Sequence, residues 1–163
     1  MSRFIVLAGA VLILCGCASQ PMLKDDKEEA RRAALELQSI MDMAASRQIP
    51  PVEFEFGSAR LLETSYPLLD KVAEVLLQHN KLKLIVSGHT DDIGSMEFND
   101  KLSLERAGAV KMYLAVKGVY PDSVRVYGYG YRVPVSRENT DKGRALNRRV
   151  EFRITLRDWG TVY

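Results

Sequence analysis

The chain has 163 residues, of which 23 are basic and 21 are acidic, so its formal net charge at pH 7 is only +2. A balance this even creates no long-range attraction to nucleic acid or acidic lipid. The hydrophobic content of 47% is enough for one core. Length and composition together predict one globular domain with additional segments.

The N-terminus has the pattern of a secretory signal. Arg3 precedes a continuous apolar run, residues 4–14, which is too short to cross a bilayer as a helix. The run ends in Leu14-Cys15-Gly16-Cys17, which resembles a bacterial lipobox. An ordinary signal peptide, cut after a small residue, is the alternative.

Only Cys17 fits the acceptor position of that lipobox, because Cys15 follows Leu14 instead of a small residue. We therefore expect residues 1–16 to be a lipoprotein signal peptide and Cys17 to carry the lipid, palmitate included. Ala18 at the next position resembles lipoproteins that are sorted to the outer membrane. Neither a cysteine pair for a disulfide nor a metal site would then remain in the mature chain.

Residues 17–50 are expected to form a lipidated N-terminus and a helical tether. The stretch from Lys24 to Arg47 is rich in helix formers and contains neither Gly nor Pro. An apolar stripe at 3–4 spacing predicts a helix that lies on the domain, stands off from the membrane or dimerises: Ala30, Ala34, Leu37, Met41 and Ala44. The prolines at 50 and 51 end the helix, so the domain is expected to cover residues 51–163.

The domain alternates strand-like and helix-like segments. Residues 52–56 alternate apolar and charged side chains, which predicts a half-buried strand. A helix is expected from Pro67 to Asn80, a strand over 82–87, a helix over 95–117, and strands over 124–127 and 149–156. This order, β-α-β-α-β-β, predicts an α+β fold, a mixed sheet with helices packed on one face. The long connection over 128–148 is expected to be functional or to contain further structure.

The junction between the strand over 82–87 and the following helix carries the best candidate site. Asp91 lies on the loop, and Asn99, Leu102 and Arg106 are spaced i, i+3, i+7, which places them on one face of the helix. An anionic carboxylate and a cationic guanidinium can thus converge on one pocket. The ligand that such a pair favours carries both an ammonium and a carboxylate group.

Other chemistry has weaker support. Gly128-Tyr129-Gly130 lacks the third glycine of a dinucleotide motif, and His89 with Asp91 lacks partners for a metal site. The basic run at Arg144, Arg148 and Arg149 has no aromatic platform for nucleic acid. Asp91 and Asp92 could serve a hydrolase as a carboxylate pair, although neighbouring loop residues normally point apart. We therefore predict a protein that is not an enzyme and has no cofactor, no metal and no nucleic-acid partner.

Three stretches carry a resemblance to a known family. They are Gly88-His89-Thr90-Asp91-x-x-Gly94, Asn99-x-x-Leu102-Ser103-x-x-Arg106-Ala107, and Asn139-Thr140-x-x-Gly143-Arg144-x-x-Asn147-Arg148-Arg149-Val150. Their order and spacing over residues 52–157 resemble the OmpA-like peptidoglycan-binding domain. With the lipobox, the chain is similar to the peptidoglycan-associated lipoprotein group.

That resemblance implies non-covalent binding of the peptide stem of peptidoglycan through its diaminopimelate residue. Asp91 would hold the ammonium of the ligand and Arg106 its carboxylate. The remaining positions implied to line the pocket are Thr90, Phe98, Asn99, Leu102 and Arg149. The expected function is to tether the outer membrane to the cell wall from the periplasm; a Tol-type or regulatory envelope protein that also binds a protein partner is the alternative.

Overall fold

The computed structural model describes residues 24–155, so the expected signal peptide and Cys17 lie outside the described residues. Within these residues there are four helices: α1 (Lys24–Ala45), α2 (Tyr66–Gln78), α3 (Met96–Val116) and α4 (Asp141–Asn147). Three strands form the sheet: β1 (Lys83–Gly88), β2 (Val124–Gly128) and β3 (Val150–Thr155). Two short 3-10 turns, Glu63–Ser65 and Pro121–Ser123, precede α2 and β2.

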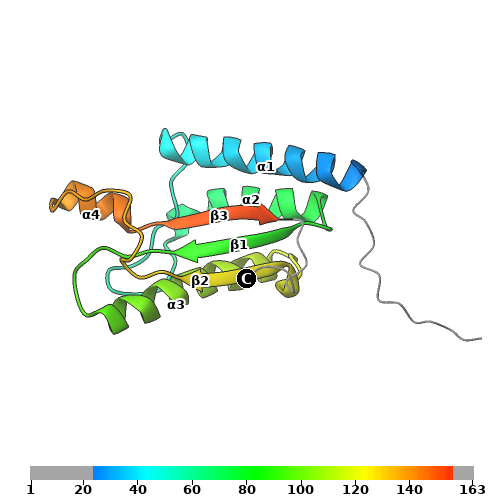
Figure 1. The fold of residues 1–163 in the computed structure, drawn as a ribbon. Coiled ribbons are helices and arrows are strands. Elements are labelled where there is room, and N and C mark those ends of the chain that lie inside the picture. The colour runs from blue at the N-terminus through cyan, green and yellow to red at the C-terminus, as the bar shows by residue number, and fades with distance from the viewer. Residues whose placement is uncertain (1–23, 156–163) are drawn as a thin grey trace, which may run out of the picture.

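The sheet is mixed and has β1 at its centre, in the order β2-β1-β3. β1 runs parallel to β2 and antiparallel to β3, which confirms the expected α+β class with a mixed sheet. α2 and α3 pass behind the sheet in Figure 1, and α1 lies against α2 and β3. No helix in the described part of the chain is long and apolar enough to span a bilayer.

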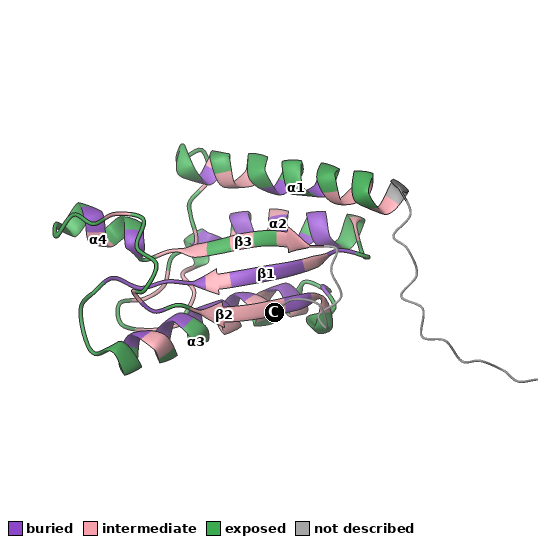
Figure 2. Cartoon of the chain, in the orientation of Figure 1, coloured by how far each residue is buried: buried purple, intermediate pink, exposed green. Residues whose placement is uncertain are grey.

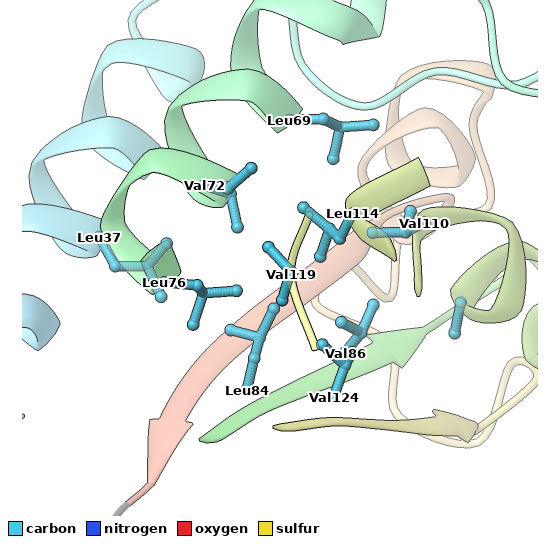
Figure 3. Close-up of a cluster of buried hydrophobic side chains, with 12 residues drawn as sticks. Leu37, Leu69, Val72, Leu76, Leu84, Val86, Val110, Leu114, Val119 and Val124 are labelled. Atoms are coloured by element: carbon cyan, nitrogen blue, oxygen red, sulfur yellow. The ribbon is translucent and has the colours of Figure 1, made fainter. Parts of the chain in front are cut away.

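The core lies between the sheet and its helices (Figure 3). The ladder places Leu84 between Val124 and Ile154, and Val86 between Val126 and Phe152, so one face of the sheet is apolar. Burial of each large aliphatic side chain stabilises the fold by roughly 1.5–3 kcal/mol. The helices contribute the other half of this core, with these buried residues: Leu37, Leu69, Val72, Leu76, Val110 and Leu114.

α1 lies on the domain and uses a slightly different stripe from the expected one. Ala33, Leu37 and Ala44 are buried, whereas Ala34 is exposed. Figure 2 shows the outer side of α1 exposed and its buried residues on the side toward α2 and β3. Contacts between side chains hold the helix to the end of α2, since His79 Nδ1 lies 3.4 Å from Glu29 Oε1 and Lys81 Nζ lies 3.2 Å from Asp26 Oδ1. The buried stripe is therefore occupied within the chain instead of being available for a dimer.

The expected strand over residues 52–56 is wrong, because this segment makes only an isolated bridge between Phe54 and Leu61. The chain folds back on itself: Glu55 N donates to Arg60 O (2.9 Å) and Leu62 N to Glu53 O (3.0 Å). Its backbone hydrogen bonds are thus made with the next segment and not with β3. Phe54 still packs on the core, which accounts for the alternating sequence pattern.

The long connection over 128–148 contains a helix, α4, as one of the two expectations for this segment stated. Thr140 caps it, as its Oγ1 accepts a hydrogen bond from Gly143 N (3.0 Å). Asn147 then closes the turn that precedes α4, because its side chain bonds the backbone of Val135 and Ser136. α4 therefore ends just before two arginines, Arg148 and Arg149, which lead directly into β3.

α3 is set very close to the sheet at two glycines. A Cβ atom on Gly88 would overlap the carbonyl oxygen of Ser103, and one on Gly128 would lie 2.6 Å from Leu104 N and 2.7 Å from Ser103 Oγ. Both glycines are needed because the helix backbone occupies the space of a side chain.

We predict that Gly88→Ala lowers the free energy of unfolding by about 1–3 kcal/mol, the usual cost of forcing an extra group into a packed interior. Urea denaturation followed by circular dichroism measures it. Gly108→Ala is the matched control, since a Cβ there has nothing within 4 Å. An equal loss of stability in both variants would contradict the argument.

Candidate functional site

The loop between β1 and α3 is held in place from several directions. His89 N donates to Arg149 O (3.0 Å) and Thr90 N to Gly130 O (2.9 Å), so the loop is attached to the segments after α4 and after β2. At its far end Ser95 caps α3, with Oγ accepting from Phe98 N at 3.1 Å. These bonds fix the backbone on both sides of Asp91.

Asp91 is buried, and each of its carboxylate oxygens accepts one hydrogen bond. Its Oδ1 accepts from Ile93 N (3.2 Å), and its Oδ2 accepts from Arg148 Nη1 (2.7 Å). Asn99, also buried, donates Nδ2 to Ile93 O (2.9 Å) and so supports the loop from the first turn of α3. The carboxylate is therefore held in one orientation before any ligand binds.

Arg106 reaches the same region from the inner face of α3. Its Nε donates to Ser58 O (3.0 Å), and its Cζ lies 5.1 Å from the centre of the Phe54 ring. Burial lowers the pKa of Arg106, the charge of Asp91 opposes that shift, and the charge of Arg148 adds to it. An arginine remains protonated in proteins, so a buried cation lies within electrostatic reach of Asp91.

Arg148 is the residue that sequence reasoning missed. The resemblance implied Arg149, which lines the cleft beside the site and donates Nε to Glu151 Oε1 (2.7 Å) and Nη2 to Val133 O (3.2 Å). Arg148 lines the same cleft and is the arginine that binds Asp91. Two adjacent arginines look alike in sequence, and only the end of α4 decides which of them faces the loop.

The other predicted pocket residues divide into two groups. Thr90 and Leu102 are buried beside Asp91 and Asn99, and the Thr90 hydroxyl has no hydrogen-bond partner within the described residues. Phe98 is exposed, next to Gly94 on the outer turn of the loop. The structure thus brings together Thr90, Asp91, Asn99, Leu102 and Arg106, with Phe98 at the rim.

A cleft of 1010 Å³ opens beside this cluster, between the end of α1, residues 50–54, β3 and α4. Apart from His89, its ionisable lining is almost wholly basic: Arg47, Arg106, Lys142, Arg148 and Arg149, with Glu53 the single acidic residue among the lining residues. A cleft lined by one sign of charge concentrates ligands of the opposite sign. No cluster of three or more His, Cys, Asp or Glu residues within 24–155 could hold a metal ion.

These features define the class of protein: a small α+β domain that holds opposite charges at a strand-to-helix loop. The model of the OmpA family matches residues 53–148, which is more than half of the chain. The chain belongs to the OmpA family, and the resemblance drawn from its motifs is confirmed.

Named relatives agree with this assignment. The chain is 32% identical to the peptidoglycan-associated lipoprotein of Pseudomonas putida, over 93% of this chain and 95% of that protein. It is 40% identical to outer membrane porin F of Pseudomonas fluorescens over 63% of this chain, but it spans only 32% of that longer protein. Among solved structures, the peptidoglycan-associated lipoprotein of Burkholderia pseudomallei superposes with a TM-score of 0.61 at 29% identity, covering 64% of this chain and 88% of that one.

His89 lies next to the site, and the burial of its ring has a consequence that can be measured. It is stacked on Tyr129 with ring centres 5.3 Å apart, and neither ring nitrogen makes a hydrogen bond within the described residues. Burial lowers the pKa of His89; the charge of Arg149 adds to this, and Glu151, 3.8 Å away, opposes it. The folded protein therefore keeps this ring neutral at a pH where the unfolded chain takes up a proton.

We predict that the free energy of unfolding decreases as the pH falls below about 6.5, the ordinary pKa of histidine, and that the loss continues down to the lowered pKa of folded His89. Denaturation at a series of pH values between 8 and 5 measures this. His89→Phe keeps the stacking and should flatten the dependence. A slope unchanged in His89→Phe would rule out this origin.

Proposed function

We propose that this chain is a non-catalytic envelope lipoprotein that binds the peptide stem of peptidoglycan and tethers the outer membrane to the cell wall. The observation that carries the proposal is the buried Asp91 within electrostatic reach of the buried Arg106, which lines a basic cleft together with Arg148, the ion-pair partner of Asp91. Relatives named peptidoglycan-associated lipoprotein support it.

The chemical group that fits these charges is the free end of a diaminopimelate residue, which carries an ammonium and a carboxylate on one carbon. Asp91 can accept the ammonium in addition to its present bonds, because an ionised carboxylate has about four acceptor positions. The hydrogen bond of Arg106 to Ser58 uses Nε, which leaves the terminal nitrogens for a ligand carboxylate. The buried Thr90 hydroxyl, which lacks a partner in the described structure, is suited to a polar ligand atom.

The charge balance of the cluster also favours such a ligand. Arg106 and Arg148 repel each other, as the effect of Arg148 on the pKa of Arg106 shows, and Asp91 compensates one of the two positive charges. A ligand carboxylate would relieve the remaining repulsion, and its ammonium would be attracted to Asp91. Asp92 is exposed and has no part in this arrangement, which disfavours a hydrolase that uses both aspartates.

We predict that Asp91→Ala and Arg106→Lys each weaken binding to purified sacculi by roughly 10- to 100-fold, since a hydrogen bond to a charged group contributes about 1.5–3 kcal/mol. Co-sedimentation of the full chain in mild detergent measures the bound fraction. Asp92→Ala is the matched control and should bind like the wild type. If Asp91→Ala and Arg106→Lys both bind normally while folded, the pocket assignment is wrong; loss of sacculus cleavage in Asp92→Ala would favour the hydrolase.

Competition identifies the chemical group. A soluble stem tripeptide that ends in diaminopimelate should displace the chain from sacculi, whereas the same tripeptide ending in lysine, whose side chain carries an ammonium without a carboxylate, should not. Equal competition by both would exclude a role for the Arg106–carboxylate contact. Thermal unfolding of each variant shows whether the fold is retained.

The lipid anchor is a separate part of the proposal, because Cys17 lies outside the described residues. We predict that Cys17→Ser abolishes incorporation of labelled palmitate in growing bacteria, whereas Cys15→Ser does not. Labelling that persists in Cys17→Ser would assign the lipid to another residue, whereas a wild-type chain without label would indicate an ordinary signal peptide.

A further inference from the structure

The outward side of α3 is apolar, although its inward side already forms part of the core. Leu102, Val110 and Leu114 are buried against the sheet. Leu104, Met112 and Val116 are 47%, 72% and 85% exposed. A surface helix usually has a polar outer face, so a second apolar stripe indicates a covering partner. α3 lies along one side of the molecule in Figure 1, opposite α1.

Gly108 stands in the middle of this stripe, and no close packing within the described residues requires a glycine there. A Cβ atom at this position would meet nothing within 4 Å, in contrast to Gly88 and Gly128. A glycine inside a helix costs roughly 0.5–1 kcal/mol relative to alanine. Nothing in the described fold recovers that cost, whereas close approach of a second helix backbone would use the missing side chain.

The surface around Gly108 is shaped for such an approach. A shallow hollow of 660 Å³ lies over it, lined by small residues and by two opposite charges: Ala59, Glu105, Gly108, Ala109, Lys111, Met112, Ala115 and Pro121. Small side chains on a helix let the backbone of another helix come near. Glu105 and Lys111 lie three residues to either side of Gly108, which gives the hollow one negative and one positive end.

We propose that α3 pairs antiparallel with α3 of a second copy of this chain, with the two helices crossing at Gly108. In a two-fold arrangement, residues equally far from the crossing point face each other. Glu105 then meets Lys111 of the partner subunit, and Leu104 meets Met112 of the partner subunit. A parallel pair would instead oppose like charges, so the charge pattern selects the antiparallel orientation.

The contacts already made on this face are weak enough to be exchanged. Glu105 has an ion pair with Lys101 at 3.8 Å, between side chains 49% and 77% exposed, and such a surface pair adds little stability. One helix pair is at the low end of specific interfaces, below about 1,200 Å², so the dimer is expected to be transient. Arg106 is two residues from Gly108, about 200° around the helix, so pairing leaves the proposed ligand site open.

Site-specific photocrosslinking in cells tests the pairing with the full chain. A photoreactive residue in place of Met112 should give a covalent product of twice the chain mass. The same residue in place of Leu35, which is 63% exposed on α1, is the matched control and should not. No product, equal product from both positions, or a product with a different protein would overturn the proposal.

Charge reversal then tests the register. Glu105→Lys should reduce the Met112 product several-fold, and the double variant Glu105→Lys with Lys111→Glu should restore it. Gly108→Ala should also reduce the amount of crosslinked product while raising the thermal stability of the chain. A variant that merely disturbed the fold would lower both. If Glu105→Lys leaves the product unchanged, or the double variant fails to restore it, the antiparallel pairing is wrong. Binding of a soluble, monovalent stem peptide should remain normal in all three, because pairing leaves each pocket unaltered, and this separates the test from that of the proposed function.

Discussion

The close contact between α3 and the ends of the two parallel strands determines most of this structure. Gly88 and Gly128 remove the side chains that would separate helix from sheet, and Gly130 N donates to Ser103 Oγ at 2.9 Å. This contact fixes the distance of α3 from the sheet and the rotation of the helix about its own axis. The positions of Asn99 and Arg106 relative to the loop follow from it, because both lie on the same face of the helix as Ser103.

Polar groups in the site are arranged before a ligand arrives. Asp91 is oriented by Ile93 and Arg148, and the loop is bound to the segments after β2 and α4. Fixed charges in a buried position lose little conformational entropy on binding, which favours affinity without a large interface. In the function that we propose, a single zwitterionic group bound in this way would give a modest, reversible attachment, and many copies on one wall would hold by avidity.

α3 serves two purposes from opposite sides in our proposals. Its inner face contributes to the core and to the charged cluster, and its outer face offers Gly108 and the flanking charges to a second copy. A transient dimer would bring two binding sites onto one wall and raise the effective concentration of the second site. Such pairing would strengthen attachment without altering either pocket.

The sequence alone determined the family motifs, the mixed α+β class, the strand–loop–helix junction and the placement of Asn99, Leu102 and Arg106 on one helix face, because these depend on local periodicity and capping. Tertiary structure decided the rest. Residues 52–56 have a strand pattern, yet their backbone bonds are made with the following segment. Arg148 and Arg149 are indistinguishable in sequence, and the end of α4 turns Arg148 toward Asp91. Which of two adjacent residues at the end of a helix faces a distant loop depends on long-range packing, and local sequence does not encode that packing.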